Sequence, residues 1–111
     1  MNEERFNQRW SLMYYLRVFD AVSGDLVGHL VDFNTDGIML ISEEAIEDNT
    51  DFTFKMEIPL GGENREQVTI IAHSQWCNQD LNTNFYDTGF KITGLSNKAR
   101  KAIELLIEKL S

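Results

Sequence analysis

Strict alternation of apolar and polar side chains is the feature that most constrains the fold of this chain. The clearest case is "FTFKMEI", residues 52–58, in which the apolar positions are Phe52, Phe54, Met56 and Ile58. Because successive side chains along a β-strand point to opposite faces, the pattern predicts a strand with one buried face and one solvated face. Such a strand needs neighbouring strands and a shared core, so the chain is predicted to be mainly β.

A second alternating segment follows after a turn-rich connection. In "VTIIAHSQW", residues 68–76, the side chains predicted to face inward are Val68, Ile70, Ala72, Ser74 and Trp76. The intervening "PLGGENRE" holds a proline and two glycines, which interrupt strands and favour a turn. The two segments are therefore predicted to form a hairpin.

Four more segments have strand character: residues 12–20, 25–33, 37–42 and 84–93. Gly24 is predicted at the tight turn between the first two of these segments. In the last segment, Gly89 marks either a bulge or a close approach of the backbone. Six short strands at regular spacing predict a six-stranded antiparallel β-barrel, which leaves no unpaired edge strand.

The hydrophobic period changes near the C-terminal end. Residues 96–110 carry apolar side chains at helical spacing, and Ser96 is suited to cap the first turn. We expect this C-terminal α-helix to lay its apolar stripe on one face or mouth of the barrel. The stripe is Ala99, Ala102, Ile103, Leu106, Ile107 and Leu110. Residues 42–49, "SEEAIEDN", form either one short helical turn or a solvated acidic loop.

The length of 111 residues predicts a single domain, covering residues 1–111. Within it, residues 1–10 are predicted to be a flexible leader that carries two arginines. Residues 11–94 are predicted to form the barrel, and residues 96–110 the helix.

The net charge of −8 predicts that neither a nucleic acid polymer nor an anionic lipid surface is a partner, because both require a broad basic surface. No apolar run approaches the roughly 20 residues that span a bilayer, so no membrane insertion is expected. The N-terminus lacks the layout of a secretion signal, and the single Cys77 suits a reducing compartment. A cytoplasmic location is predicted.

Residue types that carry catalysis or bind metals are sparse. His29, His73 and Cys77 lack the spacing of a four-ligand zinc site, so no metal is expected. No strand-to-helix elbow presents a nucleophile, and no glycine-rich loop precedes a helix. Turn geometry explains Asp32 and Asp36 without acid–base chemistry. The sequence therefore predicts neither an enzyme nor a cofactor.

Two short motifs remain, and each has an ordinary interpretation. Arg5 and Arg9 of "ERFNQRW" would be solvated residues of a frayed tail. The "NTDG" of "DFNTDG", residues 32–37, would be a turn in which Gly37 takes a dihedral that other residues resist. Considered together, they suggest a guanine site. Arginine presents a fork that matches a phosphate or the O6/N7 edge of guanine, and Asp32 and Asn34 can accept guanine N–H groups.

This combination resembles the PilZ domain, the bacterial receptor module for cyclic di-GMP. The first motif of that family is two arginines separated by three residues, here Arg5-Phe-Asn-Gln-Arg9. The second is Asp or Asn, any residue, Ser, two residues and Gly, here Asp32-Phe-Asn34-Thr-Asp-Gly37. The family fold is a six-stranded antiparallel barrel with a C-terminal helix, and the resemblance covers nearly the whole chain. One departure is that Asn34 stands where the family has serine.

The resemblance implies a ligand and a role for each matching residue. Arg5 and Arg9 would contact the guanine and phosphate groups of cyclic di-GMP. Asp32, Asn34 and Gly37 would line the barrel side of the same pocket. The leader would wrap over the nucleotide when it binds.

The resemblance further implies a cytoplasmic receptor that relays the nucleotide to an effector protein controlling motility, adhesion or biofilm formation. With no output domain attached, we expect this receptor to act as an adaptor. The alternative is a protein-interaction module of the same fold that does not bind nucleotide, with Asn34 as the sign of that loss. The surface of this module that binds the partner protein would be the acidic loop 43–51 or the exposed side of the helix. A third possibility, a hydrolase of the same nucleotide, is not expected, because this sequence offers neither the metal ligands nor the nucleophile that such an enzyme needs.

Overall fold

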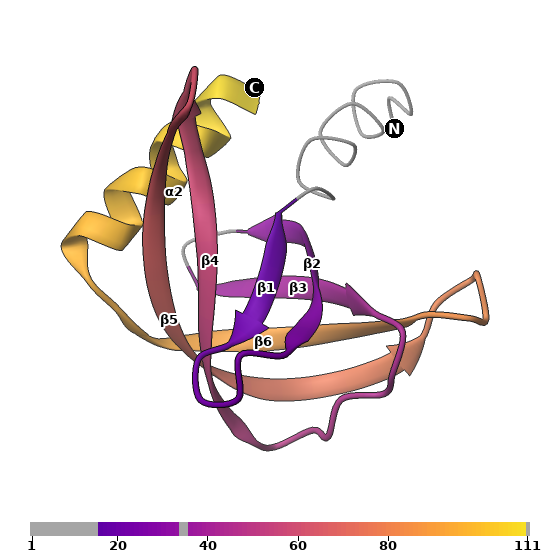
Figure 1. Cartoon of the computed structure of the whole chain (residues 1–111). Helices are drawn as coiled ribbons and strands as arrows, with labels where there is room; N and C mark the ends of the chain where they lie inside the picture. The colour runs from indigo at the N-terminus through magenta and orange to yellow at the C-terminus, as the bar shows by residue number, and fades with distance from the viewer. Residues whose placement is uncertain (1–15, 34–35, 111) are drawn as a thin grey trace.

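Six antiparallel strands close into a barrel in a computed structural model that describes residues 16–33 and 36–110 (Figure 1). Around the barrel the strands run in the order β1-β2-β3-β6-β5-β4. A C-terminal helix, α2, follows the last strand, so the predicted architecture is confirmed. The elements are β1 (Arg17–Asp20), β2 (Leu26–Phe33), β3 (Gly37–Ser42), β4 (Asp51–Gly61), β5 (Asn64–Gln79), β6 (Tyr86–Leu95) and α2 (Asn97–Leu110).

The alternating face of β4 supplies the centre of the core, as the sequence pattern predicts. Phe54, Met56 and Ile58 are each at most 1% exposed. The rings of Phe54 and Phe90 meet edge to face, with centroids 5.1 Å apart, an arrangement that aromatic pairs prefer. Because β4 and β6 lie on different parts of the barrel wall, this contact joins strands that are not neighbours.

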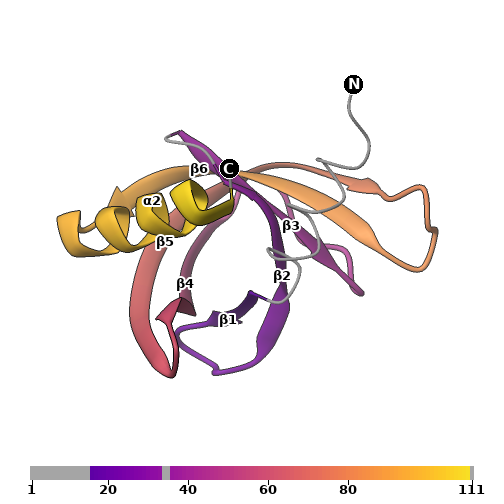
Figure 2. The same ribbon diagram turned by 90° about the horizontal axis from the view of Figure 1, so that it is seen from above.

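The helix begins as its sequence predicts, and four of the six residues of the predicted stripe are buried; the side chains of Ile107 and Leu110 lie outside the described ones. The Ser96 Oγ accepts a hydrogen bond from the backbone N–H of Ala99 at 3.0 Å, which is the geometry of an N-cap. The helix contacts β4 and β5 (Figure 2). Among its described side chains, those that are buried belong to the same hydrophobic cluster as the barrel interior, and they are Ala99, Ala102, Ile103 and Leu106. The helix therefore extends the core rather than forming a second one.

The first and fifth strands differ most clearly from their predicted bounds; β4 also extends past residue 58 to Gly61, and β6 runs two residues later than the predicted 84–93. β1 begins at Arg17, and residues 12–15 of the predicted first strand lie outside the described residues. β5 extends beyond the predicted segment at both ends. Its register against β6 shifts between Ser74 and Trp76, which is a β-bulge. Because one extra residue turns the next side chain to the other face, the prediction that Trp76 faces inward is wrong, and Trp76 is 40% exposed.

Between β3 and β4, residues 43–50 form an irregular acidic loop, so the second alternative for this segment is confirmed. Ser74, which is fully buried, fastens the loop to the barrel. Its hydroxyl donates to the Glu47 carbonyl at 2.7 Å and accepts the Thr50 N–H at 3.0 Å. These bonds explain why a polar residue occupies an inward position of β5.

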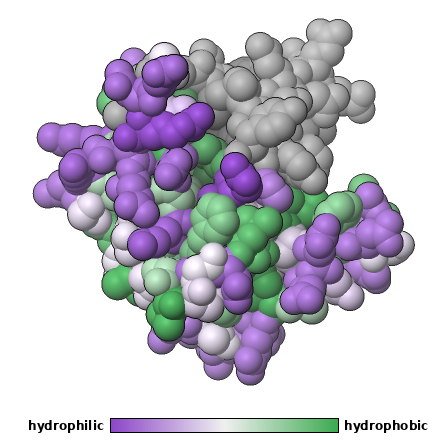
Figure 3. All heavy atoms as spheres, in the orientation of Figure 1, coloured by the Kyte–Doolittle hydropathy of each residue, from purple (hydrophilic) through white to green (hydrophobic). Residues whose placement is uncertain are grey.

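The surface of the molecule reflects the acidic composition. Figure 3 shows hydrophilic residues over most of one face, with hydrophobic residues gathered near its middle. The acidic loop contributes four exposed carboxylates, those of Glu43, Glu44, Glu47 and Asp48. Within the described part of the chain, no helix combines the length and the hydropathy required to cross a membrane.

Candidate functional site

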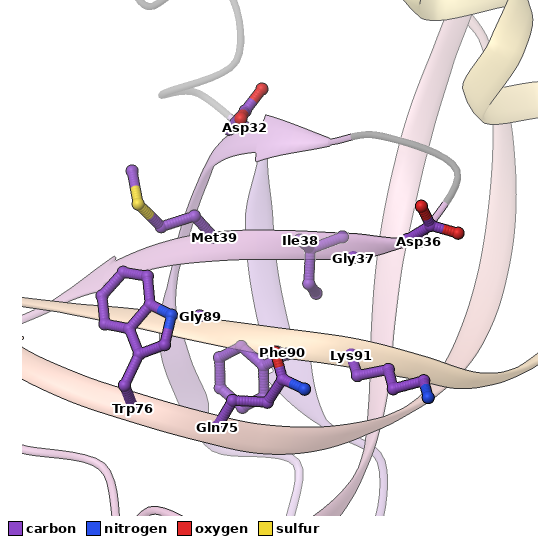
Figure 4. A pocket seen from close by; sticks show the side chains of 10 residues that line it. All are labelled: Asp32, Asp36, Gly37, Ile38, Met39, Gln75, Trp76, Gly89, Phe90 and Lys91. Carbon is purple, nitrogen blue, oxygen red and sulfur yellow. The ribbon is translucent and has the colours of Figure 1, made fainter.

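A pocket of about 560 Å³ lies on the outer wall of the barrel, where β2, β3, β6 and β5 are consecutive neighbours (Figure 4). Pockets that hold small molecules usually measure roughly 300–1,000 Å³, so this one has a suitable size. Its lining residues are Asp32, Asp36, Gly37, Ile38, Met39, Gln75, Trp76, Gly89, Phe90 and Lys91.

The strand register arranges the outward-facing residues at and beside the pocket in two rows. The first, which we call the Trp76 row, crosses four strands through directly opposed residues: Asp32, Met39, Gly89 and Trp76. The second, the Lys91 row, passes through Gly37, Lys91 and His73. Along β6 the two rows are two residues apart, which is about 6.8 Å in an antiparallel strand.

Trp76 is placed by the bulge and by the glycine opposite to it. A Cβ atom built on Gly89 would lie 2.3 Å from the Cε2 atom of the indole, so the ring occupies the space that a side chain at 89 would need. The prediction that Gly89 marks a close approach is confirmed. The indole leans over β6 and remains partly exposed (Figure 4), which makes it a platform on which a flat ring can stack.

Gly37 is also a position where two elements approach closely. A Cβ atom there would lie 2.5 Å from the carbonyl oxygen of Phe90 on β6. Among the described glycines, the positive φ angles belong to Gly24 and Gly62, so the interpretation of Gly37 as a special turn dihedral is wrong. The neighbouring strand, rather than the turn, requires a glycine at this position.

Charged groups of both signs border the pocket. Asp32, at the end of β2, and Asp36, just before β3, bring two exposed carboxylates. The Asp32 Oδ1 accepts a hydrogen bond from the N–H of Phe33 at 2.9 Å, which orients the carboxylate. Lys91 is the cation among the described lining residues, and it is exposed.

The structure brings two of the five predicted site residues together. Asp32 and Gly37 line the same pocket on adjacent strands. Arg5, Arg9 and Asn34 lie outside the described residues.

Sequence reasoning missed Trp76 and Lys91 as members of the site. Lys91 follows Gly89 by two positions, so strand alternation signals that it shares the outer face with Gly89. No comparable signal exists for Trp76, because the bulge reverses its side.

His73, the histidine of the Lys91 row, is held by one residue of β4 and one residue of the acidic loop. The His73 Nδ1 lies 2.8 Å from the Asp51 Oδ1, and its Nε2 lies 3.0 Å from the Asn49 Oδ1. These two contacts explain the presence of His73 on the surface of the sheet without a role in binding a metal or a ligand. Over residues 16–33 and 36–110, no three His, Cys, Asp or Glu side chains gather in a way that could hold a metal ion.

The structure defines a class of fold: a closed six-stranded antiparallel barrel with a C-terminal helix, the architecture implied by the PilZ resemblance. Among solved structures, this fold is shared by the Bacillus subtilis inhibitor of motility MotI/DgrA, with a TM-score of 0.66 and 8% sequence identity. The match covers 85% of this chain and 45% of that protein, so this chain spans less than half of its length. An identity this low shows a common fold. No protein-family model matches the sequence, and no curated protein matches it.

Proposed function

We propose that this protein is a cytoplasmic receptor for cyclic di-GMP that relays the nucleotide signal to an effector protein and has no catalytic activity of its own. One observation carries the proposal. Asp32 and Gly37, two residues of the second motif, line one pocket together with the exposed indole of Trp76. The fold supports the same proposal, because it is shared with a solved inhibitor of motility.

The Trp76 row has the chemistry to hold a guanine base. A base can stack on the indole, and such stacking contributes about 1–3 kcal/mol per base. The Asp32 carboxylate at the other end of the row can accept the N1–H and N2–H groups of guanine. Because the indole leans over Gly89, about two strand spacings, roughly 10 Å, separate it from β2. This distance, which Met39 spans on the barrel wall, is on the scale of one purine and its hydrogen bonds.

The two arginines complete the proposed site from outside the barrel. Arg5 and Arg9 would contact phosphate and guanine oxygen atoms through charge-assisted hydrogen bonds, which are about twice as strong as neutral ones. Ordering a leader costs about 1–2 kcal/mol for each backbone residue that becomes fixed. The arginine contacts must offset this cost, so binding is proposed to couple to a rearrangement of the leader. The rearranged surface would then meet the partner.

Calorimetric titration of cyclic di-GMP tests the proposal. We expect saturable binding to the wild-type chain and its loss in Arg5→Ala, Arg9→Ala and Asp32→Ala variants. An Arg100→Ala variant on the C-terminal helix is the matched control and should bind like the wild type. Absence of binding to a folded wild-type sample at modest salt would refute the receptor function. Chromatography of the nucleotide after incubation tests the proposed lack of catalysis.

A second candidate function is favoured by one residue, Asn34, which replaces the serine of the second motif. On this alternative the chain is an interaction module that does not bind nucleotide and contacts its partner through the acidic loop or the exposed side of α2. Partner binding that is identical with and without cyclic di-GMP, combined with a silent titration, would support it.

A further inference from the structure

Among the described lining residues, carboxylates outnumber cations, so the balance of charge in the pocket is unfavourable for a ligand with two phosphate groups. Asp32 and Asp36 contribute two carboxylates, and Lys91 contributes one ammonium group. Each phosphodiester of a cyclic dinucleotide carries one negative charge, which the carboxylates repel and the ammonium group attracts. Asp36 lies at the same end of the pocket as Lys91, whereas Asp32 lies nearer to Trp76 (Figure 4). A phosphate group is therefore expected close to the Lys91 ammonium group and away from Asp32.

The two rows supply such a separation. Figure 4 shows the indole of Trp76 and the ammonium group of Lys91 at opposite ends of the pocket. The rows lie about 6.8 Å apart along β6. A base that stacks on the indole and reaches toward Asp32 can place its sugar and phosphate on the side of Lys91, where the row along β6 carries a cation rather than the carboxylate of Asp87.

The neighbours of Lys91 leave its ammonium group accessible. On β3 its opposed residue is Gly37, which has no side chain to cover it. On β5 its opposed residue is His73, whose two ring nitrogens are engaged by Asp51 and Asn49. No carboxylate of the described residues forms an ion pair with Lys91. The ion pairs among the described residues are His73–Asp51 and Lys98–Glu66.

We propose that Lys91 is a phosphate-binding residue of this site and that it fixes the direction in which the dinucleotide lies, with a guanine over Trp76 and a phosphate group against Lys91. This inference rests on the proposed receptor function and adds to it a contact from the barrel wall.

The test uses a Trp10→Phe background, because the chain has two tryptophans and the fluorescence must report on Trp76. Cyclic di-GMP is titrated into this protein and into its Lys91→Gln, Lys91→Arg and Lys101→Gln variants. Lys101 is an exposed lysine of α2 and serves as the matched control. Both the dissociation constant and the fluorescence change at saturation are measured.

Removal of the charge in Lys91→Gln should weaken binding about tenfold, the size of one charge-assisted hydrogen bond. The fluorescence change at saturation should stay the same, because the base still stacks on Trp76. Lys91→Arg should retain most of the affinity, and Lys101→Gln all of it. A Lys91→Gln variant that binds within about twofold of the parent would overturn the proposal while leaving the receptor function intact. A parent that shows no binding would instead refute the receptor function, and the role of Lys91 with it.

Discussion

Gly37 and Gly89 both line the pocket, but different atoms exclude a side chain from each position. At Gly37 the obstacle is a backbone carbonyl oxygen of β6, which cannot move without breaking the sheet. At Gly89 the obstacle is the indole of Trp76, a side chain on the surface that can swing away. The same substitution should therefore affect stability at one position and binding at the other.

Gly37→Ala is expected to reduce the free energy of unfolding by about 1–3 kcal/mol, because the new methyl group separates β3 from β6. Urea denaturation measures this loss. The control is Gly94→Ala on β6, where the nearest atom, at 3.0 Å, belongs to the side chain of the half-exposed Ile71. A Gly37→Ala protein as stable as the wild type would show that the β3–β6 contact is less close than described.

Gly89→Ala is expected to displace the indole and to weaken cyclic di-GMP binding by about tenfold, since one stacking contact contributes about 1–3 kcal/mol. Its free energy of unfolding should change little, because the indole moves into solvent. Emission of Trp76 in a Trp10→Phe background, together with calorimetry, measures both effects. An unchanged emission spectrum with unchanged affinity would contradict the assigned position of the ring.

At the scale of the element, β4, α2 and β5 show how far sequence patterns predict this structure. The alternation in β4 predicts its buried face correctly, and the helical period and Ser96 predict α2 together with its cap. The side of Trp76 was not predictable, because a bulge adds one residue without leaving a sequence signal comparable to a glycine or proline. Local patterns report local geometry, whereas the register between strands is set by the whole barrel.

The outer end of the β5–β6 hairpin carries a pair of carboxyl groups that makes stability depend on pH. Burial, a hydrogen bond with Asp80 and the charge of Asp80 raise the pKa of Asp87 to about 6. The Asp87 Oδ1 is buried and has no hydrogen-bond partner. Because the folded state holds this proton more tightly than the unfolded state, the stabilising effect is complete below about pH 4 and is lost as the pH rises through about 6.

Asp87→Asn should remove this dependence, since the amide carries no charge at any pH. Relative to the wild type, the variant should melt at a higher temperature at pH 7.5, and the difference should shrink at pH 5. Asp25→Asn, at an exposed carboxylate of the β1–β2 turn, is the control. A stability difference between wild type and Asp87→Asn that is constant over this range would contradict the raised pKa.

At the scale of the whole molecule, sequence and structure contribute different parts of the candidate site. The motif at residues 32–37 was predictable because its residues are close in sequence, and Asp32 and Gly37 do line one pocket. The pocket itself was not predictable, because residues from four strands far apart in the chain form it. An acidic chain that binds an anion must concentrate its few cations at the site, which is the role proposed for Arg5, Arg9 and Lys91.

The most direct test of the receptor function is to follow the backbone amide and indole N–H signals of the wild-type chain by NMR while cyclic di-GMP is added. We predict saturable shifts concentrated at Gly37, Gly89 and the indole of Trp76, and much weaker shifts with cyclic di-AMP, whose adenine does not present the N–H groups that Asp32 accepts. No shifts at saturating cyclic di-GMP, or shifts that gather away from this pocket, would contradict the proposed site.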